Sequence, residues 1–351
     1  MAKKPQEALN GIVMCCGKNI FSVKCIETGN IYKCNIKGKV LKVDGAYYNP
    51  LCPGDRIQFS VCGSASTGGA ALAAGVDTAN GAALAGLLLS VEKRGSVFSR
   101  YNEKGRCTQL LAANIDQVVL ISSCAHPPFR PRFIDRVLVQ CEKSGLPPVL
   151  VLNKIDLKDC LEPCPPDDST ESVDDYAGIE RRLARFESLG CAVLRVSAVN
   201  GAGLADLRRI LKNKRSVFTG QSGAGKSTLI NAVLPGALQK TGALAVKYDR
   251  GAHTTVMGCL LEGAIDGEHA GIIDTPGLRR FVPDGISPDD LLCYMPDMAP
   301  FLGRCLYGGS CTHTHEQGCA FLEARRTGHI CEDRWTSFLS LRKTLLALRA
   351  Y

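Results

Sequence analysis

Long apolar runs are missing from this 351-residue sequence, and none of its hydrophobic stretches is long enough to cross a membrane. Residues 1–5 carry two lysines and lead into no apolar segment, which argues against a secretory signal. We therefore expect a cytoplasmic protein with no membrane partner. Cysteine, in contrast, is abundant, and in a reducing compartment most of the 18 cysteines should be free thiols.

The length of the chain predicts two or three domains. A formal net charge of +8 indicates an acidic partner without proving one. Much of this charge lies in residues 1–62, which hold nine Lys and Arg against four Asp and Glu. Nucleic-acid binding and a solvated, lysine-rich surface explain this excess equally well.

The N-terminal part alternates short β-prone runs with turns such as Pro53-Gly54-Asp55. This pattern indicates a small barrel or sandwich, and an oligonucleotide-binding (OB) barrel is one option. Residues 62–89 are rich in Gly, Ala and Ser, so we expect a flexible insertion. Residues 87–91 should return to the barrel as a strand, and a basic linker should follow over residues 93–106. We expect this first domain at residues 1–105.

The middle of the chain alternates apolar strands with helices, which predicts an α/β domain with a parallel sheet. Runs typical of buried strands cover residues 117–122, 148–152 and 192–196. Helical spacing covers residues 133–143 and 179–189. The sequence thus predicts a multidomain protein, with the α/β domain at residues 106–285 and a mainly helical domain at residues 286–351.

A glycine-rich segment at residues 220–228 reads G-x-x-x-x-G-K-S, the pattern of a phosphate-binding loop (P-loop). A β-prone run precedes it and a helical run follows it, which is the context that the motif requires. Backbone N–H groups and the helix N-terminus can then surround a phosphate. Lys226 is expected at the β- and γ-phosphates, and the Ser227 hydroxyl at Mg²⁺.

The pattern N-K-x-D occurs at the end of a predicted strand, where α/β sheets bind ligands. It comprises Asn153, Lys154 and Asp156. The Asp156 carboxylate can accept both the N1–H and the N2–H₂ of guanine, a donor pair that adenine lacks. The backbone of Ser197 and Ala198, after the third strand, can meet the guanine O6. Together with the P-loop, these residues predict a guanine-nucleotide site.

A D-x-x-G pattern spans Asp274 to Gly277. Asp274 is expected to hold Mg²⁺, and the Gly277 N–H to sense the γ-phosphate. Either Thr254 or Thr255 can add a hydroxyl ligand to Mg²⁺. The residue after the motif is a leucine, which cannot orient the attacking water, so we expect His253 to do so.

These motifs occur in a rotated order. In ordinary GTPases the P-loop comes first and N-K-x-D comes late, whereas here N-K-x-D precedes the P-loop. A complete but rotated set predicts a circular permutation, which is tolerated where the ends of a domain lie close together.

The C-terminal region contains a cluster of potential zinc ligands: Cys305, Cys311, His313 and Cys319. Three thiolates and an imidazole suit tetrahedral Zn²⁺. The spacing is not the common C-x₂-C, so free thiols are an equally good interpretation from spacing alone, and His315 is a competing ligand. Residues 336–351 show helical spacing.

Taken together, these motifs resemble the circularly permuted, ribosome small-subunit-dependent GTPase A family of bacteria. The similarity covers nearly the whole chain and includes Pro53 to Asp55, residues 109–116, and the motifs described above. One departure is the gap between Cys305 and Cys311, which is one residue longer than usual.

The resemblance implies an OB barrel, a permuted GTPase domain and a C-terminal zinc domain. It implies GTP hydrolysis stimulated by the small (30S) ribosomal subunit, a role late in its maturation, and contact with 16S rRNA. It also implies one structural Zn²⁺ on the four ligands above, beside GTP or GDP with Mg²⁺. We expect a monomer. The residues expected to bind GTP are Asn153, Lys154, Asp156, Ser197, Ala198, Gly220, Gln221, Ser222, Gly223, Ala224, Gly225, Lys226, Ser227, Thr228, Asp274 and Gly277.

Two other functions are compatible with a P-loop. A nucleotide-gated RNA-binding module would bind GTP and hydrolyse it only incidentally. A metabolic kinase is a weaker interpretation, because N-K-x-D specifies guanine and no phosphoryl acceptor site is evident.

Overall fold

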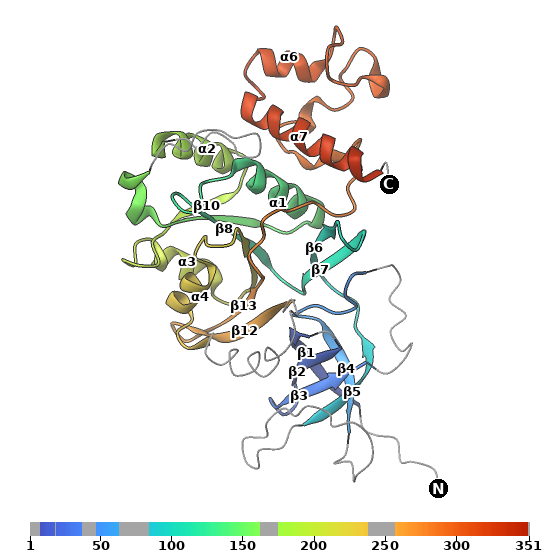
Figure 1. Cartoon of the computed structure of the whole chain (residues 1–351), viewed down its shortest axis with the longest axis vertical. Coiled ribbons are helices and arrows are strands. Elements are labelled where there is room, and N and C mark those ends of the chain that lie inside the picture. Colours follow the sequence, from blue (N-terminus) through green and yellow to red (C-terminus); the bar gives the residue numbers. More distant parts are fainter. Residues whose placement is uncertain are drawn as a thin grey trace.

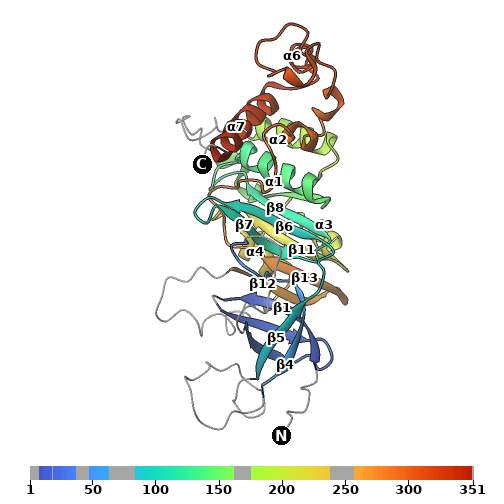
Figure 2. The same ribbon diagram turned by 90° about the vertical axis from the view of Figure 1, so that its right-hand side faces the viewer.

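The computed structural model describes residues 8–17, 19–36, 47–62, 84–161, 175–237 and 257–349. Three parts follow one another along the long axis of the molecule (Figure 1). A small β-barrel lies at the N-terminal end, an α/β domain lies in the centre, and a helical part lies at the far end. The view turned by 90° shows the same succession (Figure 2).

The N-terminal part is a closed five-stranded barrel. Its strands are β1 (Ala8–Cys16), β2 (Ile20–Cys25), β3 (Ile31–Asn35), β4 (Arg56–Val61) and β5 (Ala85–Val91). The pairing runs β1-β2-β3-β5-β4 and closes because β4 also pairs with β1. Buried residues such as Val23, Phe59 and Leu88 fill the barrel, which confirms the predicted OB-like fold.

Two details of the barrel differ from the prediction or lie beyond the description. The strand β5 begins at Ala85, so the predicted insertion at 62–89 ends earlier than expected. The rest of that insertion, apart from Cys62 and Leu84, lies outside the described residues.

The prediction of a basic linker over residues 93–106 is wrong from residue 97 onward. The strands β6 (Val97–Asn102) and β7 (Cys107–Ala113) form an antiparallel hairpin there. Buried Phe98 and Ser99 and the apolar end of β7 pack inward. The basic residues Arg100, Lys104 and Arg106 therefore lie on a hairpin and not in a flexible connection. The predicted domain limits remain a prediction.

Six strands of the central domain pair in the order β10-β9-β8-β11-β13-β12, and β12 continues the sheet to β1 of the barrel. Its strands are β8 (Gln117–Ser123), β9 (Pro148–Asn153), β10 (Ala192–Arg195), β11 (Arg215–Gly220), β12 (Met257–Ile265) and β13 (Glu268–Asp274). Only β12 runs antiparallel to its neighbour β13. The sheet therefore places the carboxyl ends of the other five strands at one edge.

Helices cover both faces of this sheet (Figure 1). One apolar cluster joins one face to α1 (Pro131–Ser144) and α2 (Tyr176–Ser188). A second joins the opposite face to α3 (Leu204–Leu211) and α4 (Lys226–Val233). The predicted α/β architecture is confirmed, with helix ends shifted by a few residues.

The C-terminal part contains short 3-10 turns and two helices. The turns are η3 (Leu291–Tyr294), η4 (Ala299–Phe301) and η5 (Gly308–Ser310), and the helices are α6 (Ala320–Arg326) and α7 (Glu332–Arg349). A buried guanidinium ties this part to the central domain. Arg334 on α7 donates to both carboxylate oxygens of Asp297 at 2.8 Å and also contacts Asp135 on α1. Within the described residues, no helix combines the length and apolarity needed to cross a membrane.

Most described cysteines are free thiols, as expected, but two are not. Cys15 on β1 and Cys259 on β12 face each other across adjacent antiparallel strands, with their Cα atoms 4.4 Å apart, and form a disulfide. The disulfide links the barrel to the central sheet at the β1–β12 pairing, which comprises two residue pairs.

We predict that this disulfide stabilises the protein thermally. It closes a loop of 244 residues, and the chain-entropy model assigns a loop of this size about 5 kcal/mol, an upper bound in practice. Dithiothreitol should lower the unfolding midpoint of the wild type by a few degrees, as measured by scanning fluorimetry. The same reagent should not move the midpoint of Cys15→Ser. A wild-type midpoint indifferent to reductant would contradict this prediction.

Candidate guanine-nucleotide site and metal centre

The P-loop connects β11 to α4 at the carboxyl edge of the sheet. Lys226, at the start of α4, is buried, and its ammonium donates to the carbonyls of Gly220 at 3.1 Å and Gln221 at 2.9 Å. These hydrogen bonds hold the start of the P-loop against the Lys226 ammonium. Burial lowers the pKa of Lys226, and the Asp274 carboxylate partly offsets this effect. The ammonium is thus held at the loop, where phosphates bind such lysines.

Asn153, the last residue of β9, connects three of the predicted motifs. Its side-chain Nδ2 donates to the Ala224 carbonyl in the P-loop at 2.9 Å. Its Oδ1 accepts the Ala198 N–H at 3.3 Å. Gly225 has a φ of 94°, and a Cβ there would lie 2.3 Å from Asn153 Nδ2, so this contact requires glycine.

The adjacent lysine makes a second connection. Lys154 Nζ donates to the Gly223 carbonyl at 2.8 Å and to the carbonyl of His126. Asp156 follows on the 3-10 turn η1 (Ile155–Cys160) and is exposed. Its carboxylate is therefore accessible to a base bound beside the lysine.

The aspartate of D-x-x-G lies at the end of β13, beside the P-loop strand β11. Burial raises the pKa of the Asp274 carboxyl to about 6, although Lys226 limits the rise. Its Oδ1 is buried without a hydrogen-bond partner among the described residues. A buried carboxylate oxygen without a partner is a suitable ligand for a hard cation such as Mg²⁺.

The structure brings together most of the residues predicted for the nucleotide. At one edge of the sheet lie Asn153, Lys154, Asp156, Ser197, Ala198, residues 220–228, Asp274 and Gly277. His253, Thr254 and Thr255 lie outside the described residues.

Sequence reasoning missed the segment after β8. Cys124 donates its thiol proton to the Lys154 carbonyl at 2.9 Å, and the His126 carbonyl accepts from the Lys154 ammonium. Both residues follow the carboxyl end of a parallel strand. That position was the signal that could have identified them.

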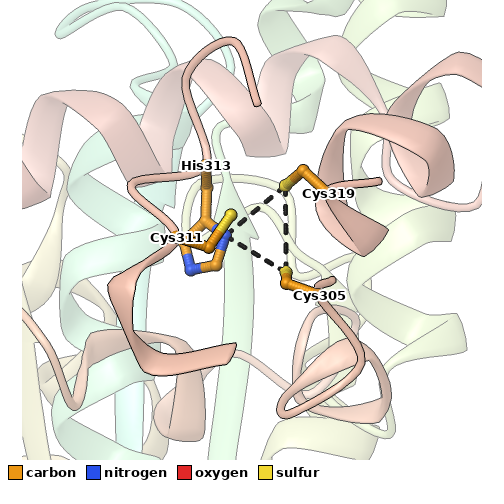
Figure 3. A group of neighbouring side chains, drawn as sticks. All are labelled: Cys305, Cys311, His313 and Cys319. Carbon is orange, nitrogen blue, oxygen red and sulfur yellow. Dashed lines mark hydrogen bonds between the residues drawn. The ribbon is translucent and has the colours of Figure 1, made fainter. Parts of the chain in front are cut away.

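A second candidate site lies in the C-terminal part. Cys305, Cys311, His313 and Cys319 offer ligand atoms that all lie within 4.8 Å of one another (Figure 3). His313 Nδ1 is 3.5 Å from the Sγ atoms of both Cys305 and Cys319, and these two sulfurs are 3.9 Å apart. A tetrahedral zinc with ~2.3 Å bonds to sulfur would place two sulfurs about 3.8 Å apart. The spacing of Cys305, His313 and Cys319 therefore suits one zinc ion, and the Cys311 Sγ lies within 4.8 Å of the other ligand atoms.

The surroundings of the cluster favour a metal ligand at His313. Burial and the nearby Arg342 lower the pKa of His313, which favours the neutral imidazole that binds metals. His315, the competing ligand, is exposed, and its Nδ1 lies 2.8 Å from the Thr314 hydroxyl. The longer gap after Cys305 does not keep this cysteine from the cluster.

Comparison with known proteins agrees with this geometry. The family model of the RsgA GTPase matches residues 91–282, more than half of the chain. The chain belongs to the RsgA GTPase family. It is thus a GTP hydrolase.

Individual relatives extend the match over most of the chain. The small ribosomal subunit biogenesis GTPase RsgA of Chlorobaculum parvum is 37% identical over 74% of this chain and 79% of its own length. The protein of the same name from Borrelia recurrentis is 32% identical over 95% of this chain and 93% of its own length.

Two solved structures share the fold. The crystal structure of YjeQ from Thermotoga maritima has a TM-score of 0.62 and 25% identity, covering 97% of this chain and 99% of that one. The circularly permuted GTPase YloQ has a TM-score of 0.61 and 20% identity, covering 99% and 98%. The rotated motif order predicted from the sequence is thus a feature of this fold.

Proposed function

We propose that this protein hydrolyses GTP in the late maturation of the small (30S) ribosomal subunit and is stimulated by that subunit. The observation that carries the proposal is the nucleotide site closed by Asn153 between the N-K-x-D segment and the P-loop. The names of the relatives, which state small-subunit biogenesis, supply the biological context.

We propose specific roles for the residues of the site. Asp156 accepts the N1–H and N2–H₂ of guanine, the Ala198 N–H meets O6, and Lys226 binds the β- and γ-phosphates. Ser227, Asp274 and one of Thr254 and Thr255 hold Mg²⁺, which shields the phosphate charge when bound. His253 orients the attacking water.

The other parts of the chain have supporting roles in this proposal. The barrel and the net charge of +8 favour contact with 16S rRNA. One Zn²⁺ on Cys305, Cys311, His313 and Cys319 stabilises the C-terminal part. The protein acts as a monomer in the cytoplasm, where small subunits mature.

Turnover with and without purified small subunits tests the function. The residue after D-x-x-G, Leu278, is 6% exposed and packs in the core, so it cannot orient water. We therefore expect slow intrinsic hydrolysis and an increase of at least tenfold on addition of small subunits. Large subunits are the matched control and should not stimulate.

A failure of small subunits to stimulate turnover would also be informative. Subunit binding without stimulation would contradict the proposal and favour an RNA-binding module with incidental hydrolysis.

His253→Ala should lower stimulated turnover at least tenfold and leave GDP affinity within twofold. An equal loss of turnover and affinity would refute its role in orienting water.

The zinc proposal is tested by metal analysis. Purified wild-type protein should contain about one zinc per chain, and Cys319→Ser should contain far less and unfold at a lower temperature, because bound zinc adds its binding free energy to folding. Cys293→Ser, an exposed free thiol in the same part of the chain, is the control and should retain zinc. Equal zinc contents in all three proteins would exclude the cluster as the ligand set.

A further inference from the structure

GTP hydrolysis requires a group that holds the attacking water, and Leu278, the residue directly after D-x-x-G, does not provide one. Leu278 is apolar and buried among the core residues that also include Phe281. Its N–H donates to the Gly220 carbonyl at 3.1 Å, and Gln221 and Leu278 form an isolated β-bridge. The residue is thus fixed against the P-loop with its side chain turned into the core.

The same contact brings a polar side chain to D-x-x-G from the other segment. A Cβ built on Gly277 would lie 2.6 Å from Ser222 Cα, 2.9 Å from Ser222 Cβ and 3.0 Å from Ser222 N. No side chain fits at position 277, so Ser222 supplies the side chain at this junction. Ser222 is exposed, and no hydrogen bond of its hydroxyl is found within the described part of the chain.

In the nucleotide site proposed above, the γ-phosphate of GTP lies at this junction. It is bounded on one side by Lys226, which is tied to the first two residues of the P-loop. On the other side it meets the N–H of Gly277. Ser222 belongs to the same loop as Lys226, and its backbone and Cβ pack against Gly277. A hydroxyl there can donate to a phosphate oxygen and accept from a water molecule.

We propose that Ser222 is a further catalytic residue of this GTPase, whose hydroxyl donates to a γ-phosphate oxygen and accepts a hydrogen bond from the attacking water. In the step, the water oxygen bonds to the γ-phosphorus as the bond to the bridging oxygen breaks. The electron pair of that bond leaves on the β-phosphate of GDP, and the water proton passes to inorganic phosphate. Ser222 orients the water and is itself unchanged.

This role rests on the nucleotide site proposed above and adds to that of His253. Removing one hydrogen-bond donor that faces charge developing in the transition state costs about 10²–10³ in rate, and the Ser222 hydroxyl would be such a donor to the γ-phosphate. GDP lacks both the γ-phosphate and the attacking water. Loss of the Ser222 hydroxyl should therefore affect the transition state and leave the GDP complex unchanged.

The experiment compares Ser222→Ala and Ser222→Gly with the wild type in single-turnover hydrolysis of GTP, with and without small subunits. Both variants should be slower by at least tenfold, with GDP affinity within twofold of the wild type. Binding of GDP with aluminium fluoride, which mimics the transition state, should weaken by a similar factor. Ser310→Ala is the matched control, because this exposed serine bonds only to its own turn and lies in the C-terminal part.

Two results would overturn the role of Ser222. One is wild-type hydrolysis by Ser222→Ala. The other is faster hydrolysis by Ser222→Gly, which would show that the side chain only crowds Gly277. A wild type that fails to bind GDP would instead contradict the nucleotide site itself, so the two failures can be told apart.

Discussion

The hydrogen bonds of Asn153 are the constraint on which the site depends. Its amide group joins the end of β9 to the P-loop through Ala224. It also joins β9 to the Ser197–Ala198 segment, after β10, through Ala198. These segments lie up to 71 residues apart in the sequence. Because the amide is buried, leaving it without partners would cost about 1–3 kcal/mol. The side chain therefore couples the base-binding segment to the phosphate-binding one, in whichever order the chain supplies them.

The permutation changes where the chain goes after the D-x-x-G segment. The segment after D-x-x-G is anchored within a few residues, because Phe281 packs between Phe98 and Phe133. The Asp284 carboxylate accepts from Ser99 and Thr108 of the β6–β7 hairpin at 2.9 and 2.8 Å. Any movement of D-x-x-G would therefore have to be absorbed between β13 and Phe281, or it would displace this anchor and the α1 helix beside it.

Much of this architecture follows from local sequence, and the remainder depends on long-range contacts. The strand ends at Asn153 and Asp274 were predicted because apolar runs stop there at polar residues. The β6–β7 hairpin is not predicted from the sequence, because the basic residues there indicate a linker. The alternation of apolar and polar side chains from Val97 to Tyr101 is too short to indicate a strand against them. The disulfide and the Gly277–Ser222 contact join residues far apart in sequence, and no local pattern reports them.

Asn153 joins the N-K-x-D segment and the P-loop into one candidate site. Competition with a fluorescent GDP analogue by GDP and by pyrophosphate, which has no base, tests it most directly. We expect Asn153→Ala to weaken both ligands, GDP by at least tenfold, whereas Asn30→Ala, in an exposed turn of the barrel, should weaken neither. Unchanged pyrophosphate binding in Asn153→Ala would contradict it, because Asn153 would then not be holding the P-loop.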